Sequence, residues 1–589
     1  MPGAGRLGTL MSMEKTRGRR RLKRVLITLT VVVGVLAAGI GGSFAWLWTS
    51  ADLSTVGKVR FGNELAVPPL APSTVDEDGT RVFDLRMQAG STEFRDGTAT
   101  PTWGFNGDHL GPTLQAERGE RVKVRVRNTL DEASSVHWHG MHLPAAMDGG
   151  PHQMVDASST WTPHWKVDQP ASTLWYHPHP HGATERHVQR GLAGMFLLDD
   201  ENSGRLALPK TYGVDDLPVM VQDVTFDGAK FDHGHRFLAN TGFLGERTMV
   251  NGTLDPYAEV GDERVRLRLL NASTARIYTF GFDDDRAFDL VGTDGGLLSA
   301  PASMNRVQLS PGERAEVVVT MRPGERTVLR SYPWRDGNGW ERRFDGGDDS
   351  FDVLQLRAAE RLRPSPEVPG RLAEDRGLEL PEADDAVRSR HFELRRSGIN
   401  GQPMAMDRID ETVTRGTTEV WTLRNGGDMT HNFHVHDVQF RVLDVNGKRP
   451  EPALRGRKDT VAVPMGATVR IALRFDGPSD PDAPYMYHCH LLSHEDDGMM
   501  GQFVVVEKGQ RAGEVPDHAG HQGVTGGSGP DRPRRLVRST ARRWNALIAE
   551  RFRRFGNAAR DGASPARAKP RARGSARHRG PGQDPPDMP

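Results

Sequence analysis

One segment of the chain combines residue types that bind a soft metal ion. Cys489, the only cysteine among 589 residues, lies between His488 and His490, and His494 and Met499 follow it. A thiolate, an imidazole and a thioether are the ligand types of a blue-copper electron-transfer centre. Neighbouring residues on an extended strand point to opposite faces, so the two flanking histidines would point away from the cysteine. One short segment would then serve two metal sites joined by a few covalent bonds.

Histidine also occurs in pairs separated by one residue, a spacing that places both imidazoles on one face of a strand. The four pairs are His137/His139, His177/His179, His434/His436 and His488/His490. A single pair is more often an ordinary core or surface feature, but four pairs together with the Cys/His/Met set predict a metal cluster between two parts of the chain. One thiolate among many imidazoles favours copper over structural zinc, which is commonly held by several thiolates.

The segments that must position these residues are short strands. Between turns rich in Gly, Pro, Asn and Asp the chain shows alternating apolar and polar residues, which is typical of all-β proteins. One pattern occurs three times, about 150 residues apart: a glycine turn, a strand with one charged and one apolar face, and a final asparagine, at 119–128, 261–271 and 416–425. Three copies predict three similar β-sandwich domains.

The beginning of the chain predicts a membrane segment. Residues 1–24 are basic, and residues 25–48 form an uncharged, mostly apolar run that is long enough to span a bilayer as a helix. The basic flank should stay in the cytoplasm and the rest of the chain outside. The length of the run and its Trp46/Trp48 edge favour a retained anchor, while secretion after signal cleavage is the alternative. We therefore expect an extracytoplasmic protein anchored to the cytoplasmic membrane.

The other end has a different composition. Residues 509–589 are rich in Gly, Pro, Arg and Ser and are predicted to be disordered. Within them, residues 534–555 have apolar side chains at helical spacing among arginines, which indicates a basic amphipathic helix that lies on anionic lipid or is simply solvated. The 77 basic and 77 acidic residues balance, so charge gives no reason to expect nucleic-acid binding. A single cysteine excludes an internal disulfide framework.

The histidine motifs resemble those of the three-domain multicopper oxidases, specifically the bacterial laccases, cuprous oxidases and bilirubin oxidases. The resemblance covers about residues 75–508 and rests on His137-Trp138-His139-Gly140, Trp175-Tyr176-His177-Pro178-His179, His431-Asn432-Phe433-His434-Val435-His436 and His488-Cys489-His490 through Met499. It implies cupredoxin-like Greek-key β-sandwich domains at 75–205, 212–362 and 387–508, with a linker at 363–386.

The resemblance also implies the roles of individual residues. A type 1 copper would be held by His431, Cys489, His494 and Met499, and a type 2 copper by His137 and His434. The type 3 pair would be held by two sets of three histidines: His139, His177 and His490 for one ion, and His179, His436 and His488 for the other. Asp148 and Glu495 match positions that supply protons to oxygen, and a solvated or capping carboxylate is the alternative interpretation of each.

The implied reaction couples one-electron oxidation of a reducing substrate to four-electron reduction of dioxygen to water, with four copper ions as cofactors. Asp428 and Met429 precede His431 and would bind Cu(I), or else only pack the loop. A phenolic or bilirubin-like compound, Cu(I) and Fe(II) all remain open as the donor. A copper-free scaffold of the cell envelope and a copper nitrite reductase are the alternatives, against which the complete ligand sets argue. We expect a monomer.

Overall fold

The computed structural model describes residues 5–49, 51–236, 238–334, 341–373, 380–396 and 398–514. The predicted helix at 534–555 and nearly all of the predicted disordered tail lie outside these ranges. Helix α1 (Gly5–Thr49) contains the predicted membrane segment. Its part Leu26–Thr49 has 24 residues with a hydropathy of 2.1, so it is long and apolar enough to cross a membrane. These properties suit a signal sequence as well as an anchor.

The first β domain consists of two sheets that enclose a core of aromatic and aliphatic side chains. One sheet has the order β2-β3-β6-β8, with β4 and β9 also paired to it: β2 (Ser73–Val75), β3 (Arg81–Arg95), β4 (Thr98–Phe105), β6 (Arg121–Asn128), β8 (Thr160–Trp161) and β9 (His164–Lys166). The other has the order β5-β11-β10-β7: β5 (Leu114–Glu117), β7 (His137–His139), β10 (Ser172–His177) and β11 (Gly194–Asp199). Helices α2 (Thr184–Gln189) and α3 (Glu201–Arg205) flank β11 in the sequence.

The second domain has the same two-layer design. Its first sheet is β1 (Asn63–Glu64), β17 (Pro256–Asp262), β25 (Phe351–Arg363), β24 (Arg326–Tyr332), β19 (Tyr278–Phe282) and β22 (Val307–Leu309). Its second is β16 (Thr253–Leu254), β15 (Arg247–Val250), β12 (Asp216–Val224), β18 (Arg264–Asn271), β23 (Arg314–Thr320), β20 (Phe288–Thr293) and β21 (Gly296–Met304). A small hairpin pairs β13 (Phe226–Asp227) with β14 (Lys230–Phe231).

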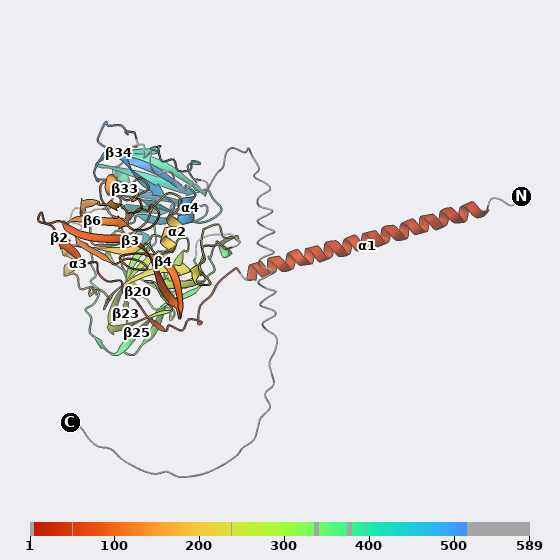
Figure 1. The fold of residues 1–589 in the computed structure, drawn as a ribbon, viewed down its shortest axis with the longest axis horizontal. Coiled ribbons are helices and arrows are strands. Elements are labelled where there is room, and N and C mark those ends of the chain that lie inside the picture. Colours follow the sequence, from red (N-terminus) through yellow and green to blue (C-terminus); the bar gives the residue numbers. More distant parts are fainter. Residues whose placement is uncertain are drawn as a thin grey trace, which may run out of the picture. The chain divides into compact units, whose positions relative to one another are not determined.

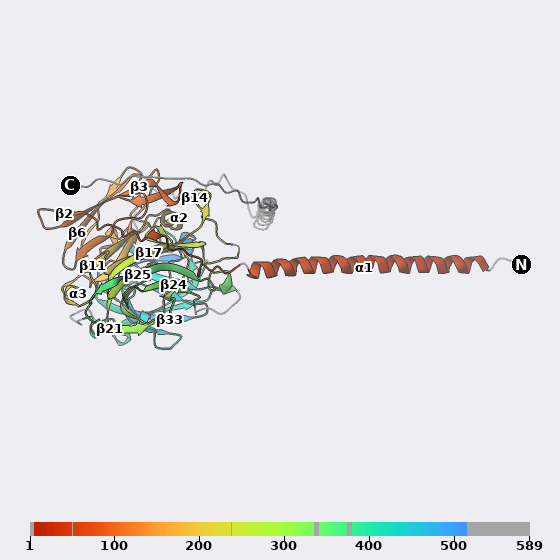
Figure 2. The same ribbon diagram turned by 90° about the horizontal axis from the view of Figure 1, so that it is seen from below.

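The third domain consists of two five-stranded sheets. One is β27 (Gly398–Ile399), β26 (Ala386–Arg395), β29 (Thr417–Asn425), β33 (Thr468–Phe475) and β31 (Phe440–Val445). The other is β28 (Glu411–Thr414), β35 (Met500–Val506), β34 (Asp480–His488), β30 (His431–Val435) and β32 (Thr460–Val463), and helix α4 (Leu492–Asp496) precedes β35 in the sequence. Figures 1 and 2 show the three domains from orange through green to blue. The described residues are thus all-β apart from α1 and a few short helices, as predicted.

The threefold pattern corresponds to β6, β18 and β29, each of which ends at its asparagine. In all three copies the asparagine amide donates to the carbonyl of a residue four or five positions on and to a second carbonyl further along, at 2.8–2.9 Å: Glu132 and Val155, Arg276 and Leu309, Met429 and Val463. The side-chain carbonyl oxygen of each asparagine accepts a hydrogen bond from the backbone N–H two residues further along the chain. The asparagine therefore fixes the turn that leaves the strand, and in the first and third domains this turn leads to the histidine motifs.

Candidate metal centres

The first centre is a buried group of two imidazoles and the thiol. The Nδ1 atoms of His431 and His494 lie 3.2 Å apart, and each lies 3.7 Å from Cys489 Sγ. Ligand atoms bound trigonally to one metal at about 2.0–2.3 Å would lie about 3.5–3.8 Å apart, which is close to this spacing. The three side chains are at most 1% exposed. Burial raises the pKa of the Cys489 thiol to about 12.

The elements around this group hold the ligand atoms in place. His431 begins β30 and His494 lies in α4. The Nε2–H of His494 donates to Asn240 O at 2.9 Å, which leaves its Nδ1 facing the thiol. Met499 is fully buried in the same cluster as Cys489, whose backbone N–H donates to Met499 O at 3.1 Å. Met499, the predicted axial ligand, therefore lies next to Cys489 in the same buried cluster.

The second centre contains the eight paired histidines, all fully buried. Their ring nitrogens form three groups within 4.8 Å: His137, His139 and His434; His139, His177 and His490; His179, His436 and His488. In the last group, Nε2 of His488 lies 3.2 Å from Nε2 of both His179 and His436. Two nitrogens bound tetrahedrally at about 2.0–2.1 Å to one metal would lie about 3.3–3.4 Å apart. The spacing therefore suits a metal ion.

Strand pairing produces this convergence. Antiparallel β7 and β10 set His137 opposite His177, and antiparallel β30 and β34 set His434 opposite His488. Only the His137/His139 pair lies wholly within one strand, because β10 and β34 end at the first histidine of their pairs and β30 ends before His436. The prediction that both histidines of each pair lie on one strand is therefore wrong for three of the four pairs. In these three, the second histidine lies just beyond the end of the strand and still joins its group.

The unused ring nitrogens mark where a metal would bind. The Nδ1 atoms of His137, His177 and His434 bond to backbone carbonyls at 2.8–3.0 Å. Their Nε2 atoms are buried and have no hydrogen-bond partner among the described residues. Buried polar atoms are rarely left without a partner, and metal-bound histidines usually donate their other N–H to a carbonyl or carboxylate. His139 is reversed: its Nε2 contacts Asp459 Oδ1 at 3.0 Å, and its Nδ1 has no partner.

Two buried carboxylates border the histidines. Asp148 Oδ2 lies 2.6 Å from His436 Nδ1, and its Oδ1 lies 3.4 Å from His137 Nδ1. Glu495 Oε1 lies 3.3 Å from His179 Nδ1, and its Oε2 lies 3.2 Å from Nδ1 of His488. Both residues are 1% exposed, so neither carboxylate is solvated.

The structure separates the two predicted substrate residues. Asp428 is exposed, whereas Met429 is 4% exposed and its carbonyl accepts from the Asn425 amide. Gly427, the residue before Asp428, packs against the first centre, because an added Cβ there would stand 3.1 Å from His431 Nε2. Asp428 thus follows a residue that contacts this centre, but the thioether of Met429 is not offered to solvent.

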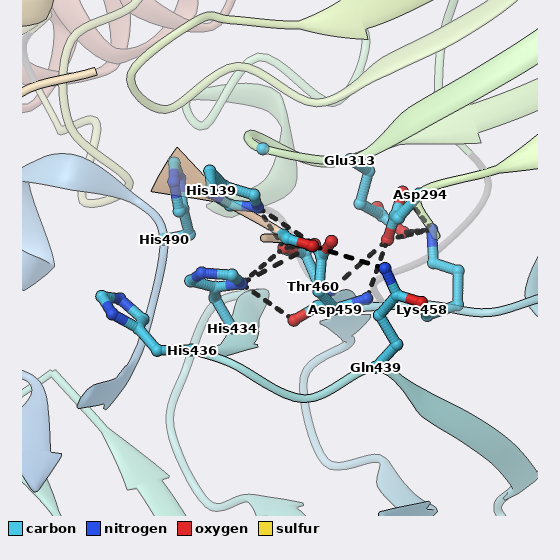
Figure 3. A network of polar contacts seen from close by, with 12 residues as sticks. His139, Asp294, Glu313, His434, His436, Gln439, Lys458, Asp459, Thr460 and His490 are labelled. Carbon is cyan, nitrogen blue, oxygen red and sulfur yellow. Dashed lines mark hydrogen bonds and ion pairs between the residues drawn. The ribbon is translucent and has the colours of Figure 1, made fainter. Parts of the chain in front are cut away.

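Residues that the sequence did not single out connect the centres. Asn432 Oδ1 accepts from the backbone N–H of His490 at 2.6 Å and lies 3.5 Å from Cys489 Sγ, so one side chain contacts both centres. Asp459 lies beside His139 (Figure 3), and Arg314 in turn donates to Asp459. Asn432 was visible inside a histidine motif. Asp459 lies just before β32 and Arg314 begins β23, 145 positions apart in the sequence, and no spacing identifies them.

Comparison with known proteins places the chain in a family. Three multicopper oxidase family models match residues 86–203, 213–333 and 378–509. A multicopper oxidase of Staphylococcus haemolyticus is 33% identical over 449 residues, which cover 75% of this chain and 92% of the relative. The cell division protein FtsP of Escherichia coli is 36% identical over 449 residues, covering 75% of this chain and 92% of the relative.

Solved structures agree with the family models. The laccase of Pediococcus acidilactici has a TM-score of 0.68 and 33% identity, and the match covers 76% of this chain and 94% of the laccase. The laccase-like multicopper oxidase CueO of Ochrobactrum sp. has a TM-score of 0.68 and 35% identity, with 75% and 100% covered. The chain therefore belongs to the multicopper oxidases, copper enzymes that oxidise a reducing substrate with dioxygen.

Proposed function

We propose that the chain holds four copper ions in a type 1 site and a trinuclear centre. The type 1 site comprises His431, Cys489, His494 and Met499, and the type 2 site comprises His137 and His434. The type 3 pair is held by His139, His177 and His490 and by His179, His436 and His488. The observation that carries this assignment is the grouping of buried ring nitrogens at metal-ligand spacing, in which Nδ1 of His139 and Nε2 of His137, His177 and His434 have no partner among the described residues. Bound copper supplies the one-electron chemistry that links substrate oxidation to reduction of dioxygen.

Cys489 connects the two centres in this proposal. Its Sγ lies 3.7 Å from the Nδ1 atoms of His431 and His494, while the adjacent His488 and His490 belong to the trinuclear groups. Electrons pass from the thiolate through its own backbone to the two flanking imidazoles. The separation keeps the reducing substrate away from the site of dioxygen reduction.

Asp148 and Glu495 supply protons to the trinuclear centre in this proposal. Each carboxylate contacts the outer nitrogens of two ligands, His137 and His436 for Asp148 and His179 and His488 for Glu495. Both are buried, so each carboxylate orients two imidazoles and can relay a proton beside the same ligands. Replacing Glu495 with Gln should therefore lower the rate of dioxygen reduction more than it lowers the copper content.

A small reducing substrate docks at the loop beside His431, with the exposed Asp428 at its edge. A carboxylate there suits a metal ion more than a phenol, whereas the buried Met429 removes the thioether from such a site. Both substrate classes occur among related structures: the Ochrobactrum protein has oxidase activity towards lignin model compounds. The Campylobacter jejuni protein, 25% identical with a TM-score of 0.66 over 78% of this chain and 98% of its own, is a metallo-oxidase.

Steady-state oxygen consumption with Cu(I), Fe(II), bilirubin and a phenol, compared side by side, tests this docking site. If a metal ion is the donor, Asp428→Asn raises KM for that ion about tenfold, equivalent to about 1.4 kcal/mol, and leaves the phenol unchanged. Asp96→Asn is the control, since Asp96 is also exposed but lies in the β3–β4 turn of the first domain. If each donor has the same KM with Asp428→Asn as with Asp96→Asn, Asp428 is not part of the substrate site.

A scaffold function is the second candidate, because FtsP relatives reach 37% identity in Xenorhabdus nematophila. The two functions differ in copper content. The purified oxidase should contain about four copper ions per chain, a nitrite reductase fewer, and a scaffold none. Copper analysis after loading therefore separates them, and a metal-free protein would overturn the oxidase proposal.

We further propose that Leu26–Thr49 is retained as a membrane anchor, which places the copper domains outside the cytoplasm. The 24-residue apolar run exceeds the usual length of a signal-peptide core. Mass spectrometry of the membrane fraction decides the question: an intact N-terminal peptide supports the anchor, and a new N-terminus after residue 49 contradicts it.

A further inference from the structure

Among the described residues, the second domain contributes none to the histidine groups. One of its loops nevertheless contacts them. This loop, residues 310–313, connects β22 to β23, which begins at Arg314. Gly312 has φ +86°, and an added Cβ would stand 3.2 Å from Cε1 of both His139 and His490. The Asn432 amide donates to Pro311 O at 2.9 Å and to Ser310 Oγ at 3.2 Å. The loop therefore packs directly on the trinuclear groups.

Arg314, directly after this loop, joins all three domains. Its Nε–H donates to Thr173 O of the first domain at 2.9 Å. Nη1 donates to Gly312 O at 3.0 Å and Nη2 to Asp294 O at 2.8 Å, both within the second domain. The remaining two N–H groups form a paired contact with Asp459 of the third domain, at 2.7 and 2.6 Å. All five donors of this fully buried guanidinium are used.

Asp459 transmits this contact to two imidazoles. Its Oδ1 lies 3.0 Å from His139 Nε2, and its backbone carbonyl accepts from His434 Nδ1 at 2.9 Å. Thr460 Oγ1, 2.9 Å from Asp459 Oδ1, also lies near both rings. Both carboxylate oxygens of Asp459 already accept N–H groups of Arg314, so Oδ1 faces His139 as a hydrogen-bond acceptor. His139 must therefore carry its proton on Nε2 and present the lone pair of Nδ1 to the other histidines, the reverse of His137, His177 and His434.

The surrounding charges reinforce the arrangement. Lys458 Nζ lies 3.0 Å from Asp294 and 2.8 Å from Glu313 (Figure 3). With Arg314 and Asp459, the cluster holds three carboxylates and two cations, so in the fully ionised state one negative charge is left over. Asp459 lies at the edge of the cluster that faces His139. An uncompensated buried charge is costly, and positive charge bound by the histidines would offset it.

We propose that Arg314 is a positioning residue for the trinuclear centre: through Asp459 it fixes the Nε2–H tautomer of His139 and so directs Nδ1 of that ring to copper. The second domain thereby controls a centre to which it gives no ligand. The identity of the metal rests on the proposed function, but the tautomer of His139 does not depend on any metal.

Two variants and one control test the proposal. Arg314→Lys keeps the charge and loses the paired contact, and Asp459→Asn is nearly isosteric, so it serves if the first variant does not fold. Arg390→Lys is the control: Arg390 is also buried and pairs with Glu419 and Glu411, but it contacts none of the histidine groups. The first measurement is nitrogen NMR of the His139 ring in the metal-free protein. The second is the chelator concentration that removes copper from each centre.

The wild type should show His139 protonated at Nε2, and both site variants should show protonation at Nδ1 or a mixture. Loss of such an outer partner typically weakens metal binding 10–100-fold, so trinuclear copper should be removed at correspondingly lower chelator while the blue type 1 copper remains. Arg390→Lys should change neither. An unchanged tautomer in both site variants, or equal loss of both centres, overturns the proposal. A wild type without copper refutes the proposed function instead, and the tautomer shift still decides the role of Arg314.

Discussion

Replacement of Gly140 by alanine tests why the first histidine motif ends in glycine. Gly140 has φ +85°, and an added Cβ would stand 2.6 Å from Asp459 Oδ2, 2.8 Å from Arg314 Nη2 and 2.9 Å from Leu174 Cδ2. The left-handed backbone alone costs an alanine about 1–2 kcal/mol. The crowding adds about 1–3 kcal/mol if the neighbours shift, and about 3–5 kcal/mol if the buried pair of Arg314 and Asp459 breaks.

Gly182→Ala is the matched control, because Gly182 follows His179 by three residues, has φ +80° and has nothing within 4 Å of an added Cβ. It should show only the backbone cost. Urea unfolding compares the two metal-free variants by their midpoints, since a three-domain chain need not unfold in two states. Gly140→Ala should also lose trinuclear copper to a chelator, while Gly182→Ala retains it. Equal midpoints and equal copper retention would refute the argument that Asp459 and Arg314 exclude a side chain at Gly140.

Three further predictions concern the two centres and the fold. Cys489→Ser should abolish both the blue colour and the oxidase activity, seen by absorption and oxygen uptake; retained oxygen reduction would contradict the electron path. Met499→Leu should keep the type 1 copper and raise its reduction potential, because the axial ligand tunes it; a redox titration with an unchanged midpoint would exclude Met499 as that ligand. Burial alone would raise the pKa of Glu316, but Arg266 and Arg268 lower it to about 2. The folded pKa lies below the ordinary 4.5, so about 3 kcal/mol of stability is present above pH 4.5 and is lost as pH falls towards 2. In Glu316→Gln the free energy of unfolding should therefore depend less on pH in that range. The same pH dependence in the variant and the wild type would contradict this reasoning.

The fold could be predicted because its signals are local. Alternation along 119–128, 261–271 and 416–425 requires only that one face of a strand be buried, and β6, β18 and β29 follow it. The strand ends were harder to predict. His179 and His490 lie beyond β10 and β34, because the chain must leave the sheet to bring ligands from two domains together. An alternating pattern predicts that a strand exists but not the residue at which it ends.

The histidines of the candidate centres could be named because each motif is compact. The partners that orient them could not, since hydrogen bonds such as His139–Asp459 and His494–Asn240 join residues 320 and 254 positions apart. A carboxylate or a carbonyl oxygen of this kind has no sequence signature of its own. The sequence therefore indicated which rings gather, and only the fold reveals which nitrogen of each ring faces the metal.

Burial also prepares the ligands before any metal arrives. It lowers the pKa of His179 and His490 to about 3 and that of His494 to about 4, so these rings stay neutral wherever a solvated histidine would begin to protonate. A neutral ring whose outer nitrogen is held by the protein offers its lone pair at no further electrostatic cost. The same burial acts in the opposite direction on Cys489, whose raised pKa keeps the thiol protonated and unreactive until a cation displaces the proton. The burial that makes the lone cysteine a candidate ligand therefore also protects its thiol.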